Sequence, residues 1–447
     1  MRAARTLYGL AWWLATPVVI AYLLWRSRRQ PEYRRHWAER WGWHRARGDT
    51  APLVWIHAVS VGETRAAAPL VARLTERDPR LRILLTHMTP TGRETGRELF
   101  GDRVEQAYLP YDTGFATRRF LRAWRPALGV LMETELWPNL AHEARRQGVP
   151  LALVSARLSE RSLARGRRWG ALVRPALAAL AYVAAQTEDD AARIRMLGRT
   201  QVDVLGNLKF DVGLDETGLA RGRAWWARIG ERPVVLAAST RDGEEALIAE
   251  AWRTEKLLTE DRHSAQGPQP AANDAPQRPL LVVVPRHPQR FDAVERLLAA
   301  LGLETARRSR ALQGEAQLPA GVDVLLGDSM GEMAAYYALA DVAIIGGSLL
   351  EYGGQNLLEA CAAGCPVIVG PHTFNFAQAA QDAIAAGAGL RATDAHRAVA
   401  LALELLADQP RAAEMRASAR RFTDAHRGAA ARIAQALRAR LPGGSTG

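Results

Sequence analysis

Residues 327–376 read GDSMGEMAAYYALADVAIIGGSLLEYGGQNLLEACAAGCPVIVGPHTFNF, and this stretch decides the fold. It contains two continuous apolar runs, 342–347 and 366–371, bounded by glycine and proline, as expected of strands buried on both faces. Between the runs, a glycine loop leads into the helical pattern LLEACAAG, which ends at Gly364. The order loop, helix, strand, glycine loop, helix, strand predicts a parallel sheet covered by helices.

The glycine loop at residues 353–356 and a second loop-to-helix junction at 327–332 predict a nucleotide site. A glycine loop that feeds a helix N-terminus presents free backbone N–H groups and the positive end of the helix dipole, so it can hold a phosphate. Glu359, one turn into the helix, is placed to accept hydrogen bonds from a ribose. The alternative is that such a loop only turns a corner. This stretch contains neither GxGxxG after a first strand nor GxxxxGK[ST], which disfavours NAD binding and ATP hydrolysis.

Length and composition limit the class of protein. The 447 residues suggest about three units, or two larger ones and an appendage. The formal net charge of +12 is nearly all arginine, since lysine occurs only at positions 209 and 256. Such a surplus suits nucleic acid, an anionic membrane surface or an acidic substrate, and its even spread along the chain ranks nucleic acid last among the three. Cys361 and Cys365 lack His or Cys neighbours at metal spacing, so we interpret them as buried small residues of a reducing compartment.

The N-terminal stretch 7–25, LYGLAWWLATPVVIAYLLW, carries no charge. It has about the length that crosses a bilayer core. The alternatives are a cleaved signal peptide, disfavoured by the missing small-residue cleavage site, and a buried core helix, disfavoured by the flanking arginines. We therefore predict a membrane anchor over residues 1–29, which either spans the bilayer or lies in its interface. The denser arginine cluster after the stretch predicts that the rest of the chain is cytoplasmic, with residues 26–43 against anionic headgroups.

After Pro52, apolar runs alternate with helical patterns. The strand candidates are 53–59, 82–88, 106–111, 127–134, 151–156, 182–186, 202–207, 233–239, 280–286, 322–328, 342–348 and 366–371. This alternation predicts two doubly wound α/β domains, 30–210 and 211–440, with ligands in a shared cleft outside the carboxyl ends of the strands. The polar segment 259–279, TEDRHSAQGPQPAANDAPQRP, is predicted to be a disordered insertion.

Several predicted strands end in residues that can carry chemistry. Glu63 sits in a helix first turn, where a carboxylate is either functional or simply favoured by the helix dipole. Glu133 and Glu135 follow a buried strand, and two acids at such a place favour function. Lys209 lies at the hinge between the domains, where an ammonium can stabilise developing negative charge or merely be solvated. Pro285-Arg286-His287 ends another strand and predicts a contact to a phosphate or a base.

Together these segments resemble one family, the membrane-associated Kdo (3-deoxy-D-manno-octulosonic acid) transferases of lipid A assembly. The segments that carry the resemblance are HAVSVGE, THMTPTG, METELWPN, SARLSERS, GNLKFD, PRHPQRF, GDSMGEM, GGSLLEYGGQNLLEA and GPHTFNF, from about residue 52 to residue 376. The resemblance implies a GT-B architecture, an inverting transfer from CMP-Kdo to lipid IVA in lipopolysaccharide biosynthesis, and no metal ion or other cofactor. It also implies the inner membrane as location, with the catalytic domains on the cytoplasmic side.

The resemblance assigns roles position by position. Glu63 matches the general base, and Glu133 and Lys209 match positions that stabilise the transition state. The expected contacts to CMP fall on Pro285, Arg286, Ser329, Met330, Gly331, Asn356, Leu357, Leu358 and Glu359.

Two alternatives remain at this point. One is another GT-B enzyme, a UDP-sugar transferase or epimerase, against which the METELWPN and GNLKFD segments argue. The other is a non-catalytic, membrane-attached nucleotide-binding protein.

Overall fold

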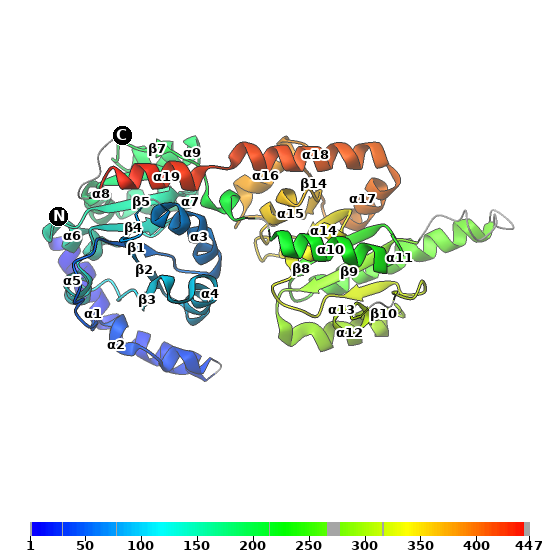
Figure 1. Ribbon diagram of the computed structural model, residues 1–447, viewed down its shortest axis with the longest axis horizontal. Helices are drawn as coiled ribbons and strands as arrows, with labels where there is room; N and C mark the ends of the chain where they lie inside the picture. Colours follow the sequence, from blue (N-terminus) through cyan, green and yellow to red (C-terminus); the bar gives the residue numbers. More distant parts are fainter. Residues whose placement is uncertain are drawn as a thin grey trace. The chain divides into compact units, whose positions relative to one another are not determined.

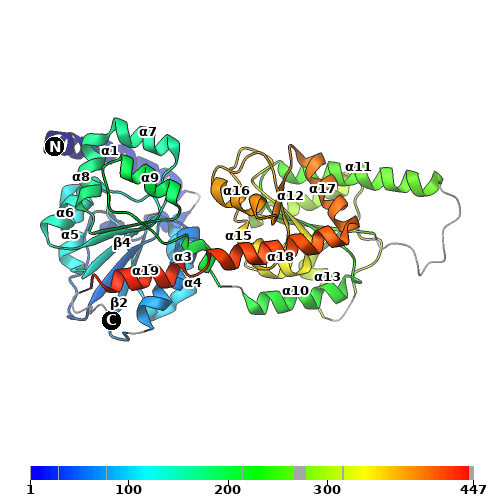
Figure 2. The same cartoon turned by 90° about the horizontal axis from the view of Figure 1, so that it is seen from above.

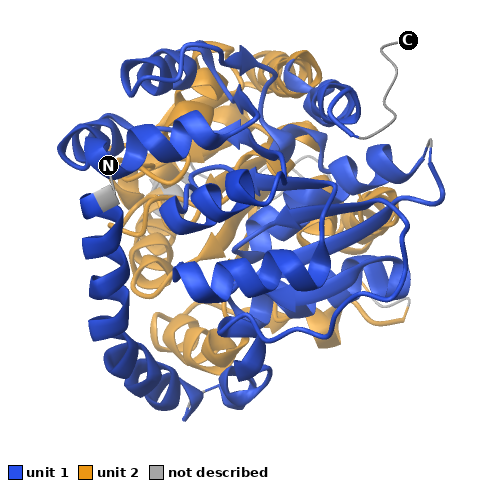
Figure 3. Cartoon of the chain, turned by 90° about the vertical axis from the view of Figure 1, so that its left-hand side faces the viewer, with its two compact units in different colours: residues 1–213, 426–447 blue, residues 214–425 orange. Residues whose placement is uncertain are grey.

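The computed structural model describes residues 2–28, 30–76, 78–213, 215–265, 278–314 and 317–441. The chain divides into two compact units, the first made of Met1–Gly213 and His426–Gly447 and the second of Leu214–Ala425 (Figure 3). Over the described residues, each unit contains a seven-stranded parallel sheet between layers of helices (Figure 1). The predicted fold class, two doubly wound α/β domains, is confirmed.

The sheet of the first unit has the strand order β3-β2-β1-β4-β5-β6-β7. Its strands are β1 (Leu53–His57), β2 (Arg82–His87), β3 (Glu105–Tyr108), β4 (Leu128–Met132), β5 (Leu151–Ala156), β6 (Tyr182–Ala185) and β7 (Asp203–Val204). Its helices are α1 (Arg2–Ser27), α2 (Trp37–Arg40), α3 (Val61–Thr75), α4 (Pro90–Phe100), α5 (Gly114–Trp124), α6 (Pro138–Arg146), α7 (Glu160–Arg168), α8 (Gly170–Ala179), α9 (Glu188–Met196) and α19 (Ala429–Arg438), with short 3₁₀ turns η1 (Pro31–Arg34), η2 (Gly101–Arg103) and η3 (Leu208–Asp211).

The second unit has the strand order β10-β11-β9-β8-β12-β13-β14. Its strands are β8 (Val234–Thr240), β9 (Leu280–Pro285), β10 (Thr305–Arg307), β11 (Val324–Leu326), β12 (Val342–Ile345), β13 (Val367–Val369) and β14 (Gly389–Arg391). Its helices are α10 (Glu216–Arg228), α11 (Glu244–Ala265), α12 (Phe291–Ala300), α13 (Arg308–Ala311), α14 (Met333–Leu339), α15 (Leu358–Ala362), α16 (Ala377–Ala385), α17 (Ala395–Ala407) and α18 (Gln409–His426, whose last residue belongs to the first unit), with the 3₁₀ turn η4 (Pro288–Arg290).

Burial on both faces explains why the strands read as continuous apolar runs. In β1, Val54 and Ile56 belong to the hydrophobic cluster on one side of the sheet, whereas Leu53 and Trp55 belong to the cluster on the other side. All five residues of β1 are buried. Successive side chains of a strand point to opposite faces, so a strand covered on both sides must be apolar throughout.

The C-terminal helix α19 packs on the first unit, beside α3 (Figures 1 and 2). Ile433 and Leu437 are fully buried in the same cluster as Leu70 of α3. Asp211 fixes the start of this segment, since its carboxylate accepts hydrogen bonds from the backbone N–H groups of Gly428 and Ala430 at 2.5 and 2.6 Å. The structure thus differs from the predicted boundary, which placed residues 211–440 in the second domain.

Two other predictions concern the segments outside the sheets. The N-terminal helix is present as α1 and covers the predicted apolar stretch. The predicted insertion 259–279 begins inside α11, which continues to Ala265. Residues 266–277 lie outside the described part of the chain.

Candidate functional site

Both sheets reverse their strand order at a switch point, where neighbouring strands carry their helices to opposite faces. In the first unit β1 lies between β2 and β4, and in the second β8 lies between β9 and β12. Ligands of open α/β sheets bind at such points, outside the carboxyl ends of the strands. Glu63 follows β1 and Glu133 follows β4, so two of the predicted catalytic residues come from the strand pair at the switch point of the first unit.

Glu63 occupies the first turn of α3, where its side chain binds back to the two residues that precede the helix. Ser60 is the N-cap, and the Glu63 carboxylate accepts hydrogen bonds from the Val59 N–H at 2.9 Å and from the Ser60 hydroxyl at 3.0 Å. The pattern S-x-x-E stabilises a helix start. Glu63 therefore has a structural role at the start of α3, which was the alternative to a functional one. Burial, followed by the negative charge of Glu133, nevertheless raises the pKa of Glu63 to about 7. A carboxylate with this pKa is suited to accept a proton near neutral pH.

Glu133 and Lys209 form an ion pair, with 2.6 Å between Lys209 Nζ and Glu133 Oε1. Both side chains are largely buried, at 19% and 11% exposure. The backbone of Glu133 has φ 56, a left-handed conformation that costs a non-glycine residue about 1–2 kcal/mol. Such strain concentrates at functional sites. The structure therefore brings together two residues that lie 76 positions apart in the sequence.

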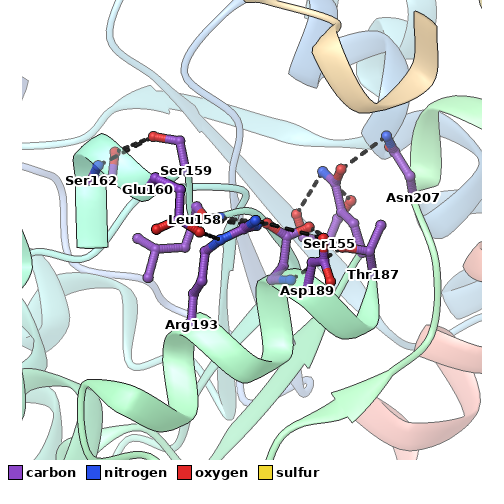
Figure 4. Close-up of polar contacts among 11 residues, drawn as sticks. Ser155, Leu158, Ser159, Glu160, Ser162, Thr187, Asp189, Arg193 and Asn207 are labelled. Carbon is purple, nitrogen blue, oxygen red and sulfur yellow. Dashed lines mark hydrogen bonds and ion pairs between the residues drawn. The ribbon is translucent and has the colours of Figure 1, made fainter. Parts of the chain in front are cut away.

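A series of hydrogen bonds between Asn207 and Ser155 (Figure 4) holds the segment that precedes Lys209. The Asn207 side chain accepts a hydrogen bond from the Lys209 N–H at 2.9 Å and donates one to Gln186 at 3.1 Å. Gln186 in turn donates to the carbonyl oxygen of Ser155 at 2.9 Å. Ser155, at the end of β5, is also left-handed with φ 49. The ends of β5 and β6 thus fix the backbone at Lys209.

Further contacts join the segment after β5 to α9 (Figure 4). The Leu158 N–H donates to the buried Asp190 carboxylate at 2.8 Å, and Arg193 binds Glu160 at 2.6 Å. Arg193 also lies within ion-pair distance of Asp189, at 3.6 Å. These contacts order the SARLSERS segment at the same carboxyl edge of the sheet.

The second carboxylate of the METELWPN segment is held by an aromatic residue. Trp137 Nε1 donates to Glu135 at 2.7 Å, and His57 Nε2 lies 4.0 Å from the same carboxylate. Burial raises the pKa of Glu135 and lowers the pKa of His57 to about 3, so the histidine is neutral at physiological pH. The His57 ring packs edge-on against Trp137, with centroids 6.2 Å apart.

In the second unit, arginines gather at the carboxyl ends of β8 and β9. The Arg286 N–H donates to the Thr240 carbonyl at 2.9 Å, which sets Pro285 and Arg286 beside the end of β8. Burial and the positive charges of Arg241, Arg286 and Arg290 lower the pKa of His287. Part of this positive charge is balanced, because Arg290 forms ion pairs with Asp242 and Glu245, and the edge with Arg241 and Arg286 suits an anionic ligand.

A buried acid, Glu244, organises the switch point of the second unit. Its carboxylate accepts hydrogen bonds from the backbone N–H groups of Arg241, Gly347 and Leu349 at 2.8, 2.6 and 2.9 Å, and the residue is fully buried. Gly346 permits the ends of β8 and β12 to lie this close together, since a Cβ at Gly346 would lie 2.4 Å from the Ser239 carbonyl oxygen. Glu244 thus joins the loops that follow β8 and β12.

The glycine loop ends at Asn356, which directly precedes Leu357, the N-cap of the short helix α15. The side chain of Asn356 accepts a hydrogen bond from the Leu358 N–H at 3.1 Å and donates one to Glu359 at 3.0 Å. The helix begins at Leu358 and covers five residues, whereas the sequence predicted a helix directly after Asn356. The Asn356 side chain therefore binds the Leu358 N–H, one of the groups that the sequence prediction had assigned to a phosphate. Leu357 is buried at the N-cap.

The predicted loop at 329–331 follows β11. The Ser329 hydroxyl is hydrogen-bonded to the Tyr336 hydroxyl at 3.0 Å. Met330 is half exposed, and Gly331 has φ 78. In each unit, the predicted residues gather at the carboxyl edge of that unit's own sheet.

Sequence reasoning missed two buried acids that shape these edges. Glu244 binds backbone groups more than 100 residues away, and Asp112 binds the start of α6. Both follow strands by a few residues, which was the available signal. Among the residues that the structure describes, no group of three or more His, Cys, Asp and Glu side chains is arranged to hold a metal ion.

Comparison with known proteins gives two family matches. Residues 35–212 match the family described as 3-deoxy-D-manno-octulosonic-acid transferase (kdotransferase), and residues 285–422 match glycosyl transferases group 1. The chain is 52% identical over 398 residues to the 3-deoxy-D-manno-octulosonic acid transferase of Bordetella pertussis, covering 88% of each chain. It is 37% identical over 370 residues to the enzyme of the same name from Haemophilus influenzae, covering 81% of each chain.

The solved structure of a putative UDP-N-acetylglucosamine 2-epimerase from Listeria monocytogenes shares the fold. The TM-score is 0.56 at 16% identity, over 87% of this chain and 96% of that chain. At this level of identity the likeness concerns the fold alone.

Proposed function

The chain belongs to the 3-deoxy-D-manno-octulosonic acid (Kdo) transferase family, and we propose that it transfers Kdo from CMP-Kdo to lipid IVA with inversion at the anomeric carbon. That the protein is a glycosyltransferase follows from the family. The non-catalytic alternative is therefore wrong. The donor, the acceptor and the stereochemistry are the proposal, and the observation that carries it is Glu63 with a pKa near neutrality beside the Glu133–Lys209 pair.

In the proposed reaction, the Glu63 carboxylate takes the proton from an acceptor hydroxyl. The hydroxyl oxygen then bonds to the anomeric carbon of Kdo, while the bond from that carbon to the phosphate oxygen breaks and CMP leaves with the electron pair. A single displacement with a base on the side of the nucleophile inverts the configuration. Base assistance of this kind contributes about 10²–10⁴-fold to the rate.

Lys209 supplies positive charge close to the carboxylates of the first unit. The ion pair with Glu133 and the hydrogen bond from its own N–H to Asn207 fix the position of its ammonium group. A preorganised cation in a partly buried site stabilises developing negative charge without reorganisation during the reaction. We therefore propose that Lys209 stabilises the transition state and that Glu133 orients Lys209.

The second unit is the proposed donor domain. The arginine-rich edge at Arg286 offers positive charge to the phosphate of CMP, and Glu359, held by Asn356, offers a carboxylate to ribose hydroxyls. Both features support a nucleotide ligand. They do not require a metal ion, because the cationic side chains can balance the charge of the leaving group.

We further propose that α1 attaches the protein to the cytoplasmic face of the inner membrane. Among the described residues, one helix, Ala3–Ser27, is long and apolar enough to cross a membrane. It packs on the first unit through the buried Leu23 and the partly buried Trp12 and Val19, whereas Leu10, Trp13 and Leu14 are exposed. A helix that contacts its own domain along one face is suited to lie in the interface, where the acceptor's acyl chains can stay in the bilayer.

The test compares Glu63→Gln with Glu76→Gln, a change at the exposed C-terminal end of the same helix. We expect Glu63→Gln to retain CMP binding and to lose at least ~10²-fold in turnover of CMP-Kdo and lipid IVA. Glu76→Gln should behave as the wild type. Near-normal turnover of Glu63→Gln would reject Glu63 as the base. Turnover of UDP-N-acetylglucosamine instead of CMP-Kdo by the wild-type protein would reject the proposed donor.

A further inference from the structure

The METELWPN segment, which carries Glu133, Glu135 and Trp137, ends at a helix start that cannot cap itself. Helix α6 begins at Pro138, which has no backbone N–H, and its N-cap, Trp137, has no side-chain oxygen. A helix start leaves its first N–H groups without partners inside the helix, and these need acceptors from elsewhere when they are buried.

Asp112, from the segment after β3, supplies those acceptors. Its carboxylate accepts hydrogen bonds from the Asn139 N–H at 3.0 Å and from the Leu140 N–H at 2.8 Å. The Asn139 side chain returns a hydrogen bond to the Asp112 carbonyl oxygen at 2.7 Å. Asp112 is fully buried. A residue distant in sequence therefore fixes the point at which the catalytic segment ends.

The other end of the segment is fixed by β5. The Glu133 N–H donates to the Val154 carbonyl at 3.1 Å, and the Arg157 N–H donates to the Glu133 carbonyl at 3.3 Å. The chain turns at Glu133 and Thr134 and has no regular secondary structure from Glu135 to Trp137. The orientation of the segment therefore depends on two attachments, and Asp112 provides the second.

The same segment after β3 also contacts α1. Trp12 of α1 packs on Tyr111, with ring centroids 5.6 Å apart. Tyr8, one turn earlier, meets the Asp112 carboxylate, whose charge and hydrogen bonding add to the effect of burial in raising the pKa of the Tyr8 phenol. Tyr111 and Asp112 are adjacent, so both contacts to α1 act on the residue that holds the start of α6.

We propose that Asp112 is a positioning residue for the catalytic segment 133–137 and that Tyr8 couples this segment to the seating of α1. The inference rests on the proposed function in one respect, that α1 is the membrane-binding helix. Seating of α1 on the first unit then favours the active arrangement of Glu133 and Trp137. Loss of the Tyr8 hydroxyl leaves α1 in the membrane but loosens the segment.

The experiment compares Tyr8→Phe with Tyr22→Phe in the full-length protein. Tyr22 lies on the same helix, is 48% exposed, and its hydroxyl accepts a hydrogen bond from Arg26 instead of contacting Asp112. With CMP-Kdo and lipid IVA, we expect kcat of Tyr8→Phe to fall about five- to tenfold, equivalent to about 1–1.4 kcal/mol. The KM for CMP-Kdo should stay unchanged, and Tyr22→Phe should match the wild type in both parameters.

Hydrogen exchange without substrate provides a readout that does not depend on activity. Backbone amides of residues 133–140 should exchange faster in Tyr8→Phe and Asp112→Asn than in the wild type and Tyr22→Phe. If Asp112→Asn does not fold, Tyr8→Phe alone decides. Adding Tyr8→Phe to a folded Asp112→Asn should have no further effect, because both act through one carboxylate.

Unchanged exchange in Tyr8→Phe, or an equal change in Tyr22→Phe, overturns the inference even if the protein transfers Kdo. Conversely, if the wild type does not use CMP-Kdo, the proposed function fails while the exchange result still decides the coupling. Flotation of each variant with vesicles checks that α1 remains bound, and release of Tyr8→Phe from vesicles would contradict the proposal.

Discussion

The pH dependence of turnover follows from the surroundings of Glu63. Burial and the nearby charge of Glu133 raise its pKa to about 7, from an ordinary value of 4.5. Only the deprotonated carboxylate can take a proton from the acceptor, so the active fraction of the enzyme changes across neutral pH.

The magnitude follows from the titration of one group. With a pKa of about 7, roughly 9% of Glu63 is deprotonated at pH 6 and roughly 91% at pH 8, so kcat/KM should rise about tenfold between these values. A glutamate with its ordinary pKa would be almost fully deprotonated at both pH values, and kcat/KM would then rise by only a few per cent.

The assay is the initial rate of CMP release at acceptor and donor concentrations well below their KM, in buffers of constant ionic strength from pH 5.5 to 8.5. We expect a single inflection near pH 7. In Glu133→Gln the residual activity should have its inflection at lower pH, because that variant removes a negative charge that disfavours ionisation of Glu63. A profile that is flat between pH 6 and 8, or an inflection that survives in Glu63→Gln, would refute the reasoning.

Four further predictions concern stability and cofactors. Because the raised pKa makes folded Glu63 bind its proton more tightly than the unfolded chain does, the free energy of unfolding should fall as pH rises from about 4.5 to about 7; Glu63→Gln should lessen this fall in denaturant titrations. Glu133→Gly should be more stable than Glu133→Ala by about 1–2 kcal/mol, since both lose the carboxylate but only glycine accepts φ 56 freely; equal melting temperatures would contradict the strain. Ile433→Ala should destabilise the first unit by about 2–5 kcal/mol, and loss of protection confined to the second unit under hydrogen exchange would be the contrary result. Turnover should persist in EDTA, because Lys209 and the arginines at β9 balance the charge; loss of activity restored by one divalent ion would oppose this.

Much of the fold could be predicted because the central strands are buried on both faces. Each predicted strand is present, within a few residues of its expected ends. The strands β10 (TAR) and β14 (GLR) were missed, because short edge strands with polar or glycine residues produce no apolar run. The placement of α19 was missed for another reason, since its apolar face shows that the helix packs but not which sheet it packs on.

The candidate site was predictable where function and local position coincide. The predicted catalytic residues each follow the end of a strand, at the start of a helix or turn: Glu63, Glu133 and Lys209. In a parallel sheet the carboxyl ends of the strands lie at one edge, so these residues could be expected to lie near one another. The ion pair between Glu133 and Lys209 could not be read from spacing, because it depends on the strand order. The role of Asp112 could not be predicted for the same reason, since tertiary packing determines which residues it contacts.

Mass analysis of the product from wild-type protein, CMP-Kdo and lipid IVA tests the central claim most directly. We expect release of CMP and lipid IVA heavier by one or more Kdo residues, and NMR should show that the transferred Kdo has the anomeric configuration opposite to that of the donor, which establishes inversion. Lipid IVA of unchanged mass, with the purified protein folded and CMP-Kdo intact, would contradict it.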